Sequence, residues 1–415
     1  MLIAFFLTAC SDFFEPVKST PEPTEYSYNY WLLQRTYLYE GELPLLDADG
    51  DSISSLYNAL NDPYTRYVPP SKSEETSSHI NTSIVQGDIG LEYSLFPGME
   101  HPLVIQRIYP NSPADRAKVP RYGNILEING VEITGDNAYA TYDSVLSQNK
   151  NIILTVSSQD DTLQFEMEKE DIYAPTVFAD TINDIEIITI RGFKPSTIDA
   201  KEGTLGELRR HLDSTRTSKE VRLLDLRGNP GGHISQCIAM ADLFIKEGII
   251  STRKWRSISP DGESVHRSET EVAKSGDSGE DGKFVLLLNR GSASCTEIFA
   301  AALQEGRGIK VAGETSYGKG IGQSTWSTPA GGLAIITNLE FLTPKGNSYH
   351  KKGIIPDYPC ETASIQCGFD AIQKYYESRK SKKESISLKD ILILRKESVV
   401  GGAFIEGDPK LFLEH

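Results

Sequence analysis

Two glycine-rich segments of this 415-residue chain carry residue types that could do chemistry. Residues 289–297 (Asn-Arg-Gly-Ser-Ala-Ser-Cys-Thr-Glu) follow an apolar stretch and precede a helical pattern. At such a junction a serine oxygen can be exposed while the next amide and the helix dipole face a developing oxyanion. Residues 224–232 (Leu-Asp-Leu-Arg-Gly-Asn-Pro-Gly-Gly) form a second junction, whose glycines leave backbone N–H groups uncovered. This turn lacks the Gly-Lys-Ser/Thr of a nucleotide loop, so phosphate binding is the weaker interpretation.

A serine hydroxyl needs a base within hydrogen-bond reach, and Lys319 is the candidate. It lies between two glycines and four residues before Gln323, which could hold the amine through a hydrogen bond. To work near neutral pH, the pKa of a lysine has to fall from about 10.4 to roughly 7, equivalent to about 4–5 kcal/mol of desolvation. Judged from these residues alone, a lysine in such a loop is more often solvated. The role of Lys319 as a base is therefore a hypothesis.

Two other classes of function compete with a Ser/Lys hydrolase. One is a peptide-binding scaffold with an inactive hydrolase domain, which requires Lys319 to be solvated and far from the serine. The other is a Ser/His/Asp hydrolase, because the chain has seven histidines, including His233 directly after the glycines and His211. Substitution of Lys319 by alanine separates the three, since only the first loses an existing cleavage activity.

The elements around these segments predict an α/β multidomain protein. From about residue 185 onward strands alternate with helices, with strands at 221–226 and 284–288 and helices at 234–245 and 295–304. Residues 261–283 lack periodicity and predict a long flexible loop.

The first part of the chain has a different pattern. Residues 29–60 show helix-like spacing and predict a small helical cap, and the polar residues 71–82 predict a hinge. The apolar pattern then changes to period two, which is typical of a β-rich module. Within it Asn129-Gly130 predicts a hairpin, because both residues tolerate positive φ.

The N-terminus indicates export. Met1 to Ala9 are almost wholly apolar but too few to span a membrane, and Leu-Thr-Ala-Cys resembles a lipobox in which Cys10 becomes a lipid anchor. A chance cysteine in a signal peptide is the alternative. The Pro-rich residues 11–25 suit a tether. We therefore expect a lipid-anchored protein of the bacterial cell envelope, on the periplasmic or the cell-surface side of the outer membrane.

The net charge and the cysteines limit which binding partners, disulfides and metal sites are expected. Lys and Arg number 42 and Asp and Glu 58, a net charge of −16, which argues against nucleic-acid binding. Cys360 and Cys367 are the best candidates for a disulfide because they lie close together in an exported chain, while Cys237 and Cys295 have no predicted partner. No Cys-x-x-Cys or His-x-x-x-His pattern supports a metal site, and no cofactor is expected.

Both junctions, the Gly-Lys-Gly segment and residues 353–357 (Gly-Ile-Ile-Pro-Asp) resemble the C-terminal processing peptidases, a family of tail-specific serine endopeptidases with a Ser/Lys dyad. Residues 62–67 (Asp-Pro-Tyr-Thr-Arg-Tyr) are similar to the segment before the family's PDZ domain, and residues 111–117 and 123–130 resemble PDZ signatures. Departures include Lys118, where a PDZ domain often has a small residue, and Asn124 in place of the usual aspartate.

The resemblance implies roles by position. Ser294 would be the nucleophile, Lys319 the general base and Gln323 the residue that orients it, with Ser292 only a neighbour. The implied oxyanion donors are the amide of Cys295 and an amide of Gly231-Gly232. Because Cys295 would act through its backbone, its side chain has no part in that role.

The resemblance also implies how substrates are recruited. The PDZ module would bind protein or peptide substrates by their C-terminal tails through strand addition at Gly90, Leu91 and Tyr93, and peptide binding could order the dyad. A homo-oligomer is possible. We expect the chain to contain a signal at 1–10, a tether at 11–25, a helical region at 26–82, a PDZ-like domain at 83–172, a peptidase core of the crotonase-like/ClpP-like type at 173–379, and a tail at 380–415.

Overall fold

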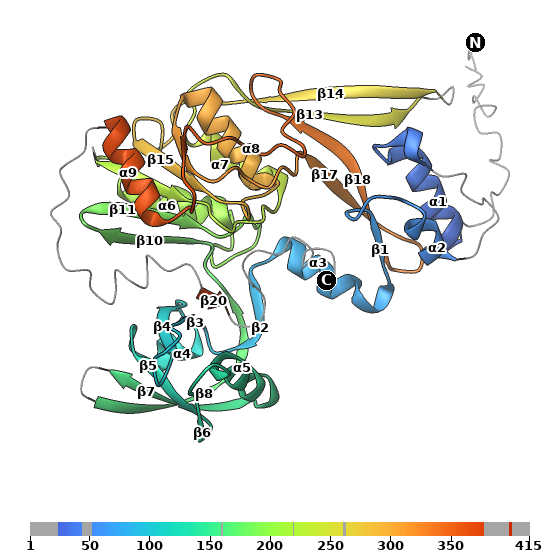
Figure 1. Cartoon of the computed structure of the whole chain (residues 1–415). Coiled ribbons are helices and arrows are strands. Elements are labelled where there is room, and N and C mark those ends of the chain that lie inside the picture. Colours follow the sequence, from blue (N-terminus) through green and yellow to red (C-terminus); the bar gives the residue numbers. More distant parts are fainter. Residues whose placement is uncertain are drawn as a thin grey trace, which may run out of the picture.

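The computed structural model describes residues 24–43, 52–158, 161–218, 220–259, 263–376 and 398–400. Cys10 with its lipobox, nearly all of the tether and most of the predicted tail lie outside the described residues. The α/β multidomain fold is confirmed: Figure 1 shows a layered α/β core, a smaller β-rich module below it, and a long sheet that leads from the core to the N-terminal helices. Among the described helices, none is both long and apolar enough to cross a lipid bilayer.

The core is built on a six-stranded sheet in which five neighbouring strands run parallel and β10 is antiparallel. Its order is β10 (Val177–Ile182), β11 (Ile185–Ile190), β12 (Val221–Asp225), β15 (Lys283–Leu288), β16 (Lys310–Gly313) and β19 (Tyr358–Pro359). Strand residues alternate between two apolar layers, as the pleat requires. Leu224 and Leu286 share one buried cluster with three helices, and Leu223 and Val285 share another with a fourth helix.

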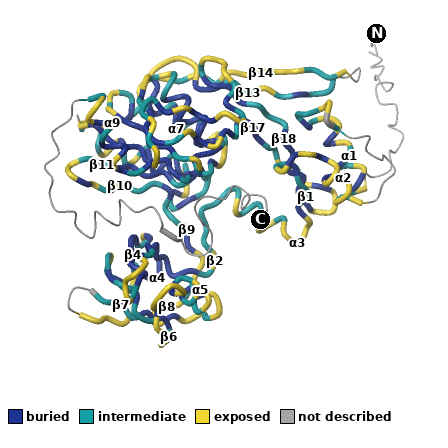
Figure 2. Tube along the Cα trace, in the orientation of Figure 1, coloured by how far each residue is buried: buried dark blue, intermediate teal, exposed yellow. Residues whose placement is uncertain are grey.

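Four helices cover the two faces of this sheet, and Figure 2 shows the interior between them as buried. On one face lie α6 (Thr204–Ser214), α7 (Ile234–Asp242) and α8 (Cys295–Ala301), the last continued by the π-helical turn η2 (Ala302–Gly306). On the other lies α9 (Ile365–Tyr376). The predicted strands and helices of this region are thus confirmed, with α7 and α8 each about three residues shorter than expected.

A second sheet joins the core to the N-terminal region. It contains β1 (Arg66–Val68), β18 (Leu333–Leu342), β13 (Ile249–Ile258) and β14 (Ser264–Val272), with β17 (Ile321–Ser327) also paired to β18. The helices α1 (Glu25–Thr36) and α2 (Ile53–Asn58), separated by the short turn η1 (Glu40–Glu42), form the predicted helical cap. They pack on β18 through Ala334 and Ile336.

Two expectations about local structure are wrong. Residues 261–283 are not one long loop, because β14 pairs with β13 over most of its length and forms a hairpin arm. Most side chains of β14 are exposed, so its sequence does not show the alternation of apolar and polar residues that predicts a strand. The predicted hinge at 71–82 is α3 (Pro70–Asn81), which begins with a proline at its first turn and has no buried residue. Both elements escape detection because neither buries an apolar face.

The β-rich module is attached through a two-stranded neck of β2 (Ile84–Asp88) and β9 (Glu170–Tyr173). Its sheet contains β3 (Leu91–Leu95), β4 (Leu103–Ile108), β5 (Asn124–Ile128), β6 (Val131–Glu132), β7 (Asn151–Ser158) and β8 (Asp161–Glu168), with α4 (Pro113–Ala117) and α5 (Ala138–Gln148). The predicted hairpin is confirmed, with φ of 50° at Asn129 and 75° at Gly130. A short strand from the C-terminal region, β20 (Ser398–Val400), pairs antiparallel with β3.

Candidate active site

Ser294 lies at the junction where the buried strand β15 leads into α8. It is the N-cap residue of that helix and has φ 57° and ψ −118°, a backbone region that costs a non-glycine residue on the order of 1–3 kcal/mol. Such a conformation persists only where its surroundings hold it. The amide of Ser294 donates to Glu297 Oε2 at 2.8 Å, and the amide of Ala293 donates to the Asn229 carbonyl at 3.0 Å.

The second glycine-rich junction lies directly against this serine. A Cβ placed on Gly231 would lie 2.9 Å from Ser294 Cβ, 2.9 Å from the Cys295 nitrogen and 2.8 Å from the Ala293 oxygen. Gly231 also has φ of 103°. No other residue type fits here, because both the backbone angle and the space exclude a side chain. The structure therefore brings the two junctions together, as their chemistry requires.

The backbone amides of Gly231, Gly232 and Cys295 differ in whether they already donate a hydrogen bond within the protein. The Gly231 amide donates to Asn229 Oδ1 at 2.9 Å and is therefore occupied. Within the described part of the chain, neither the Gly232 nor the Cys295 amide donates to a protein acceptor. Of the two candidate glycines, the geometry thus favours Gly232 as the donor that acts with Cys295.

Asn229 is a residue of this site that sequence reasoning missed. It is fully buried and sits between the two junctions. Its Nδ2 donates to the Ile190 carbonyl at 2.9 Å, and its own carbonyl accepts from Thr296 Oγ1 at 2.9 Å as well as from the Ala293 amide. A polar residue between two glycine-containing turns, here Gly-Asn-Pro-Gly, was the available signal.

Glu297 is the second missed residue, and it links the serine to the lysine. Its Oε2 accepts the Ser294 amide at 2.8 Å and the Lys319 amide at 2.7 Å. Its Oε1 accepts Ser316 Oγ and the Gly318 amide, both at 2.6 Å. Burial raises the pKa of this carboxyl group, although the four hydrogen bonds act in the opposite direction. A Ser-x-x-Glu pattern at a helix start is a capping signal that could have indicated it.

Lys319 lies in the turn before β17, partly buried, with its Nζ 4.4 Å from the centre of the Tyr64 ring. Burial, assisted by the nearby Arg66 guanidinium, lowers the pKa of this amine to about 8. The Lys319 ammonium is therefore destabilised in the way that a lysine base requires. The glycines beside it are needed because a Cβ on Gly318 or Gly320 would lie within 3 Å of backbone atoms of residues 350–353.

Tyr64 is a further residue that sequence reasoning did not single out. It belongs to the segment 62–67, where Asp62 Oδ1 accepts its amide at 3.0 Å and its hydroxyl lies 3.1 Å from that of Tyr317. The segment thus brings an aromatic face from the N-terminal region onto the Lys319 amine. Its resemblance to a family motif was noted, but only the fold shows this contact.

The described contacts do not complete the dyad. No hydrogen bond among the described residues joins Ser294 Oγ to Lys319 Nζ, and none joins Gln323 to that amine. Gln323 lies on β17 and its Nε2 donates to Thr337 Oγ1 at 3.1 Å. Ser292 is a structural neighbour, as expected: it is buried, and its hydroxyl donates to the Leu226 carbonyl at 2.9 Å.

The two histidines considered as alternative bases are engaged elsewhere. His233 Nδ1 lies 2.9 Å from the hydroxyl of Ser235, and His211 Nε2 lies 3.0 Å from Glu186. Within the described residues neither contacts Ser294. This arrangement disfavours a Ser/His/Asp hydrolase.

Two disulfides lie in the core. Cys360 and Cys367 are bonded, as predicted. The second bond, between Cys237 on α7 and Cys295 on α8, was not predicted, and it gives the Cys295 side chain a structural part next to Ser294. The pairing is invisible in the sequence because 58 residues separate the two positions.

In the β-rich module, the three residues expected to bind peptide lie at the start of β3. Gly90 has φ of 83°, and a Cβ on it would lie 2.1 Å from Ser112 Cβ. Leu91 and Tyr93 are buried in the module, the Tyr93 ring 4.9 Å from that of Tyr142 on α5. Any contribution of these two residues to peptide binding therefore comes from their backbone.

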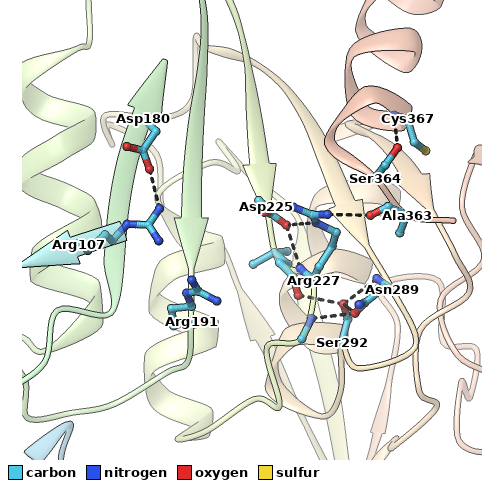
Figure 3. A network of polar contacts seen from close by, with 12 residues as sticks. Arg107, Asp180, Arg191, Asp225, Arg227, Asn289, Ser292, Ala363, Ser364 and Cys367 are labelled. Atoms are coloured by element: carbon cyan, nitrogen blue, oxygen red, sulfur yellow. Dashed lines mark hydrogen bonds and ion pairs between the residues drawn. The ribbon is translucent and has the colours of Figure 1, made fainter. Parts of the chain in front are cut away.

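A chain of buried charges connects this strand to the core. Glu92 on β3 is fully buried and lies 2.7 Å from Arg191 and 3.3 Å from Arg107, which in turn contacts Asp180 on β10 at 2.6 Å. Figure 3 shows Arg107, Asp180 and Arg191 on neighbouring elements, with the Asp225–Arg227 and Asn289–Ser292 contacts nearby.

From Arg191 the backbone leads directly to the turn that contains Gly231 and Gly232. Two residues later, the Phe193 amide donates to the Gly231 carbonyl at 3.1 Å, and the Phe193 carbonyl accepts the His233 amide at 2.7 Å. The edge of β3 and the glycines next to Ser294 are thus joined by a short series of contacts.

Comparison with known proteins agrees with this arrangement. A model of "Peptidase family S41" matches residues 184–360, the range that holds both junctions and Lys319. This part of the chain is similar to peptidase family S41. The C-terminal processing peptidase resemblance is therefore confirmed.

Curated relatives are similar to more of the chain than the family model covers. A "Probable CtpA-like serine protease" of Staphylococcus aureus (strain N315) is 28% identical over 318 residues, which is 76% of this chain and 60% of the relative. The same-named protein of Staphylococcus saprophyticus is 27% identical over 321 residues, 76% of this chain and 61% of its own length. The chain thus spans about 60% of the length of these curated relatives.

A solved structure shows the same fold. The putative S41 protease from Bacteroides fragilis NCTC 9343 is 15% identical, covers 84% of this chain and 92% of its own, and has a TM-score of 0.55. At this identity the likeness concerns the fold alone.

Proposed function

We propose that this protein is a serine endopeptidase that cleaves peptide bonds with Ser294 as nucleophile and Lys319 as general base. The observation that carries the proposal is the Glu297 carboxylate, which accepts the backbone amides of both residues and so fixes them around one buried group. The lowered pKa of the Lys319 amine supports the assignment, because the neutral form is needed to accept a proton.

The proposed reaction follows the acyl-enzyme route. Neutral Lys319 Nζ accepts the hydroxyl proton of Ser294 while the Oγ attacks a substrate carbonyl. The amides of Cys295 and Gly232 donate to the oxyanion, and the lysine returns its proton to the leaving amine. Water then hydrolyses the ester by the same proton transfers.

One movement is required before this chemistry. The Lys319 amine rests on the Tyr64 ring and has to turn toward Ser294 Oγ, where Gln323 would hold it. A lysine has four rotatable side-chain bonds, so this movement needs no change of fold. We propose that substrate binding favours the turned position.

Substrate recruitment by the β-rich module is the second part of the proposal. A PDZ domain adds the tail of its ligand as an antiparallel strand to one sheet edge. The edge of β3 accepts a strand of that kind, since Ser398 pairs with Ser94, Val399 with Tyr93 and Val400 with Glu92. A substrate tail on this edge would lie beside Glu92, from which the contacts through Arg191 lead to Gly231.

The expected location is also a proposal. An anchor at Cys10 in the bacterial cell envelope is supported by the lipobox-like sequence and by the two disulfides, which form in oxidising compartments. Protein or peptide substrates are the partners that fit the site, and a homo-oligomer remains an expectation from the sequence.

The decisive experiment compares the full chain with its Ser294→Ala and Lys319→Ala forms. Each is incubated with an unfolded protein that ends in an apolar tail, and the fragments are identified by mass spectrometry. We expect cleavage by the native chain alone. Cleavage that survives Lys319→Ala would overturn the lysine base. An inactive native chain that still binds the tail would identify a scaffold, the alternative in which Ser294 and Lys319 do not act together.

A further inference from the structure

The disulfide between Cys237 and Cys295 joins the two helices that follow the reactive junctions. Cys237 lies in the first turns of α7, five residues after Gly232, and Cys295 is the first residue of α8, directly after Ser294. Their Cα atoms are 5.7 Å apart, and both side chains are fully buried in the main apolar cluster.

This bond is placed where the backbone most needs support. The φ of 57° at Ser294 is unfavourable and has to be maintained by its neighbours. On one side of the junction the Ser294 amide donates to Glu297, which also accepts the Lys319 amide. On another side the Ala293 amide donates to the carbonyl of Asn229, which lies in the Gly-Asn-Pro-Gly turn. The disulfide adds a third restraint, because it ties Cys295, the residue after Ser294, to Cys237 on α7.

The bond also connects the two amides proposed to receive the oxyanion. One is the amide of Cys295 itself, and the other belongs to Gly232, which is tied to the strand-end residue Phe193 and leads into α7. Removing one donor from an oxyanion hole lowers kcat by roughly 100- to 1,000-fold, because the donors must be preorganised. A shift of α8 against α7 would move one donor relative to the other.

We propose that the Cys237–Cys295 disulfide positions the Cys295 amide for oxyanion stabilisation, so that full activity requires this bond to be oxidised. The inference rests on the proposed peptidase function. The two cysteines are positioning residues, since neither side chain contacts the reacting atoms.

The test compares two double variants of the full chain on a fluorescence-quenched peptide with an apolar tail. Cys237→Ala/Cys295→Ala removes this bond, and Cys360→Ala/Cys367→Ala removes the other disulfide and serves as the matched control. We expect kcat to fall at least tenfold with KM within twofold in the first variant, and little change in the second. Affinity for a peptide boronic acid, whose adduct places an oxygen in the oxyanion site, should fall in parallel with kcat.

A redox titration of the native chain keeps the inference testable if the first variant does not fold. A dithiol reductant supplies two electrons and two protons, the S–S bond breaks into two thiols, and the reductant closes to its own disulfide. Alkylation and mass spectrometry then give the reduced fraction at each cysteine pair. Loss of activity should follow reduction of Cys237–Cys295 and return on reoxidation.

The outcomes separate the two proposals. A folded Cys237→Ala/Cys295→Ala variant with native kcat, or a native chain that stays active with this pair reduced, overturns the positioning role and leaves the peptidase intact. An oxidised native chain with no Ser294-dependent cleavage overturns the peptidase function itself. Equal losses of kcat in both double variants would indicate general destabilisation and also contradict the positioning role.

Discussion

Replacing Lys319 by methionine should stabilise the folded protein at neutral pH. Burial lowers the pKa of this amine from its usual 10.5 to about 8, so at pH 7 the folded state carries an ammonium group that its surroundings disfavour. Methionine keeps most of the apolar stem and has no charge to desolvate. Lys319 is therefore expected to reduce stability, as a group kept for its proposed chemistry would do.

The size of the expected gain in stability follows from the pKa shift of Lys319. Each pKa unit corresponds to about 1.4 kcal/mol, so the fall from 10.5 to about 8 gives about 3 kcal/mol. The side chain is only partly buried and the Tyr64 ring attracts its ammonium form, which reduces the expected gain to about 2 kcal/mol. Below pH 8 the full difference is present. Between pH 8 and 10.5 the unfolded chain binds more protons than the folded one, so the native protein recovers stability and the gain disappears.

The assay is urea denaturation of the native chain and of Lys319→Met at pH 7 and pH 10. Lys345→Met, at an exposed position, is the matched control and should change stability equally at both pH values. A gain for Lys319→Met that is the same at pH 7 and pH 10 would refute the buried amine. The proposed role of Lys319 as general base predicts that kcat/KM of the native chain rises with pH through a midpoint near 8, because only a neutral amine could accept the proton of Ser294.

Three other substitutions or deletions test the remaining contacts. Gly231→Ala should lower kcat at least 100-fold, because its Cβ would collide with the Ser294 junction, whereas Gly346→Ala, also at positive φ but in open space, should leave kcat nearly unchanged in the same peptide assay. Arg191→Ala should lower the free energy of unfolding by about 2–4 kcal/mol in urea titrations, since it removes a partner of the buried Glu92 carboxylate; a loss under 0.5 kcal/mol would contradict that role. Deletion of residues 377–415 removes β20 and should tighten binding of an apolar-tailed peptide severalfold by calorimetry, unless β3 is not the peptide site.

Ser294 and Lys319 could be proposed as reactive residues from the sequence because the patterns that suggest their chemistry are local. A serine at a strand-to-helix junction and a lysine between glycines are patterns within a few residues of the chain. The strands and helices of the core were predictable for the same reason, since each buries an apolar face with a regular period. The elements α3 and β14 were missed because they expose most of their surface and so lack a regular spacing of apolar residues.

The residues that hold the site together could not be found in this way. Glu297 and Asn229 act through contacts between segments about 20 to 70 residues apart, and Tyr64 reaches Lys319 from the N-terminal region. The lowered pKa of Lys319 is likewise a property of the folded surroundings, because it arises from burial and from Arg66.

By itself the amino-acid sequence determined which groups can react, where the apolar strands and helices of the core form, and that Cys360 could pair with Cys367. Only the tertiary structure decided that Gly231 lies against Ser294, that the Glu297 carboxylate accepts the amides of Ser294 and Lys319, and that Cys237 is bonded to Cys295. The physical reason is range: periodicity and turn chemistry act between neighbours in the chain, whereas hydrogen bonding, desolvation and disulfide pairing depend on which distant segments the folded core brings into contact.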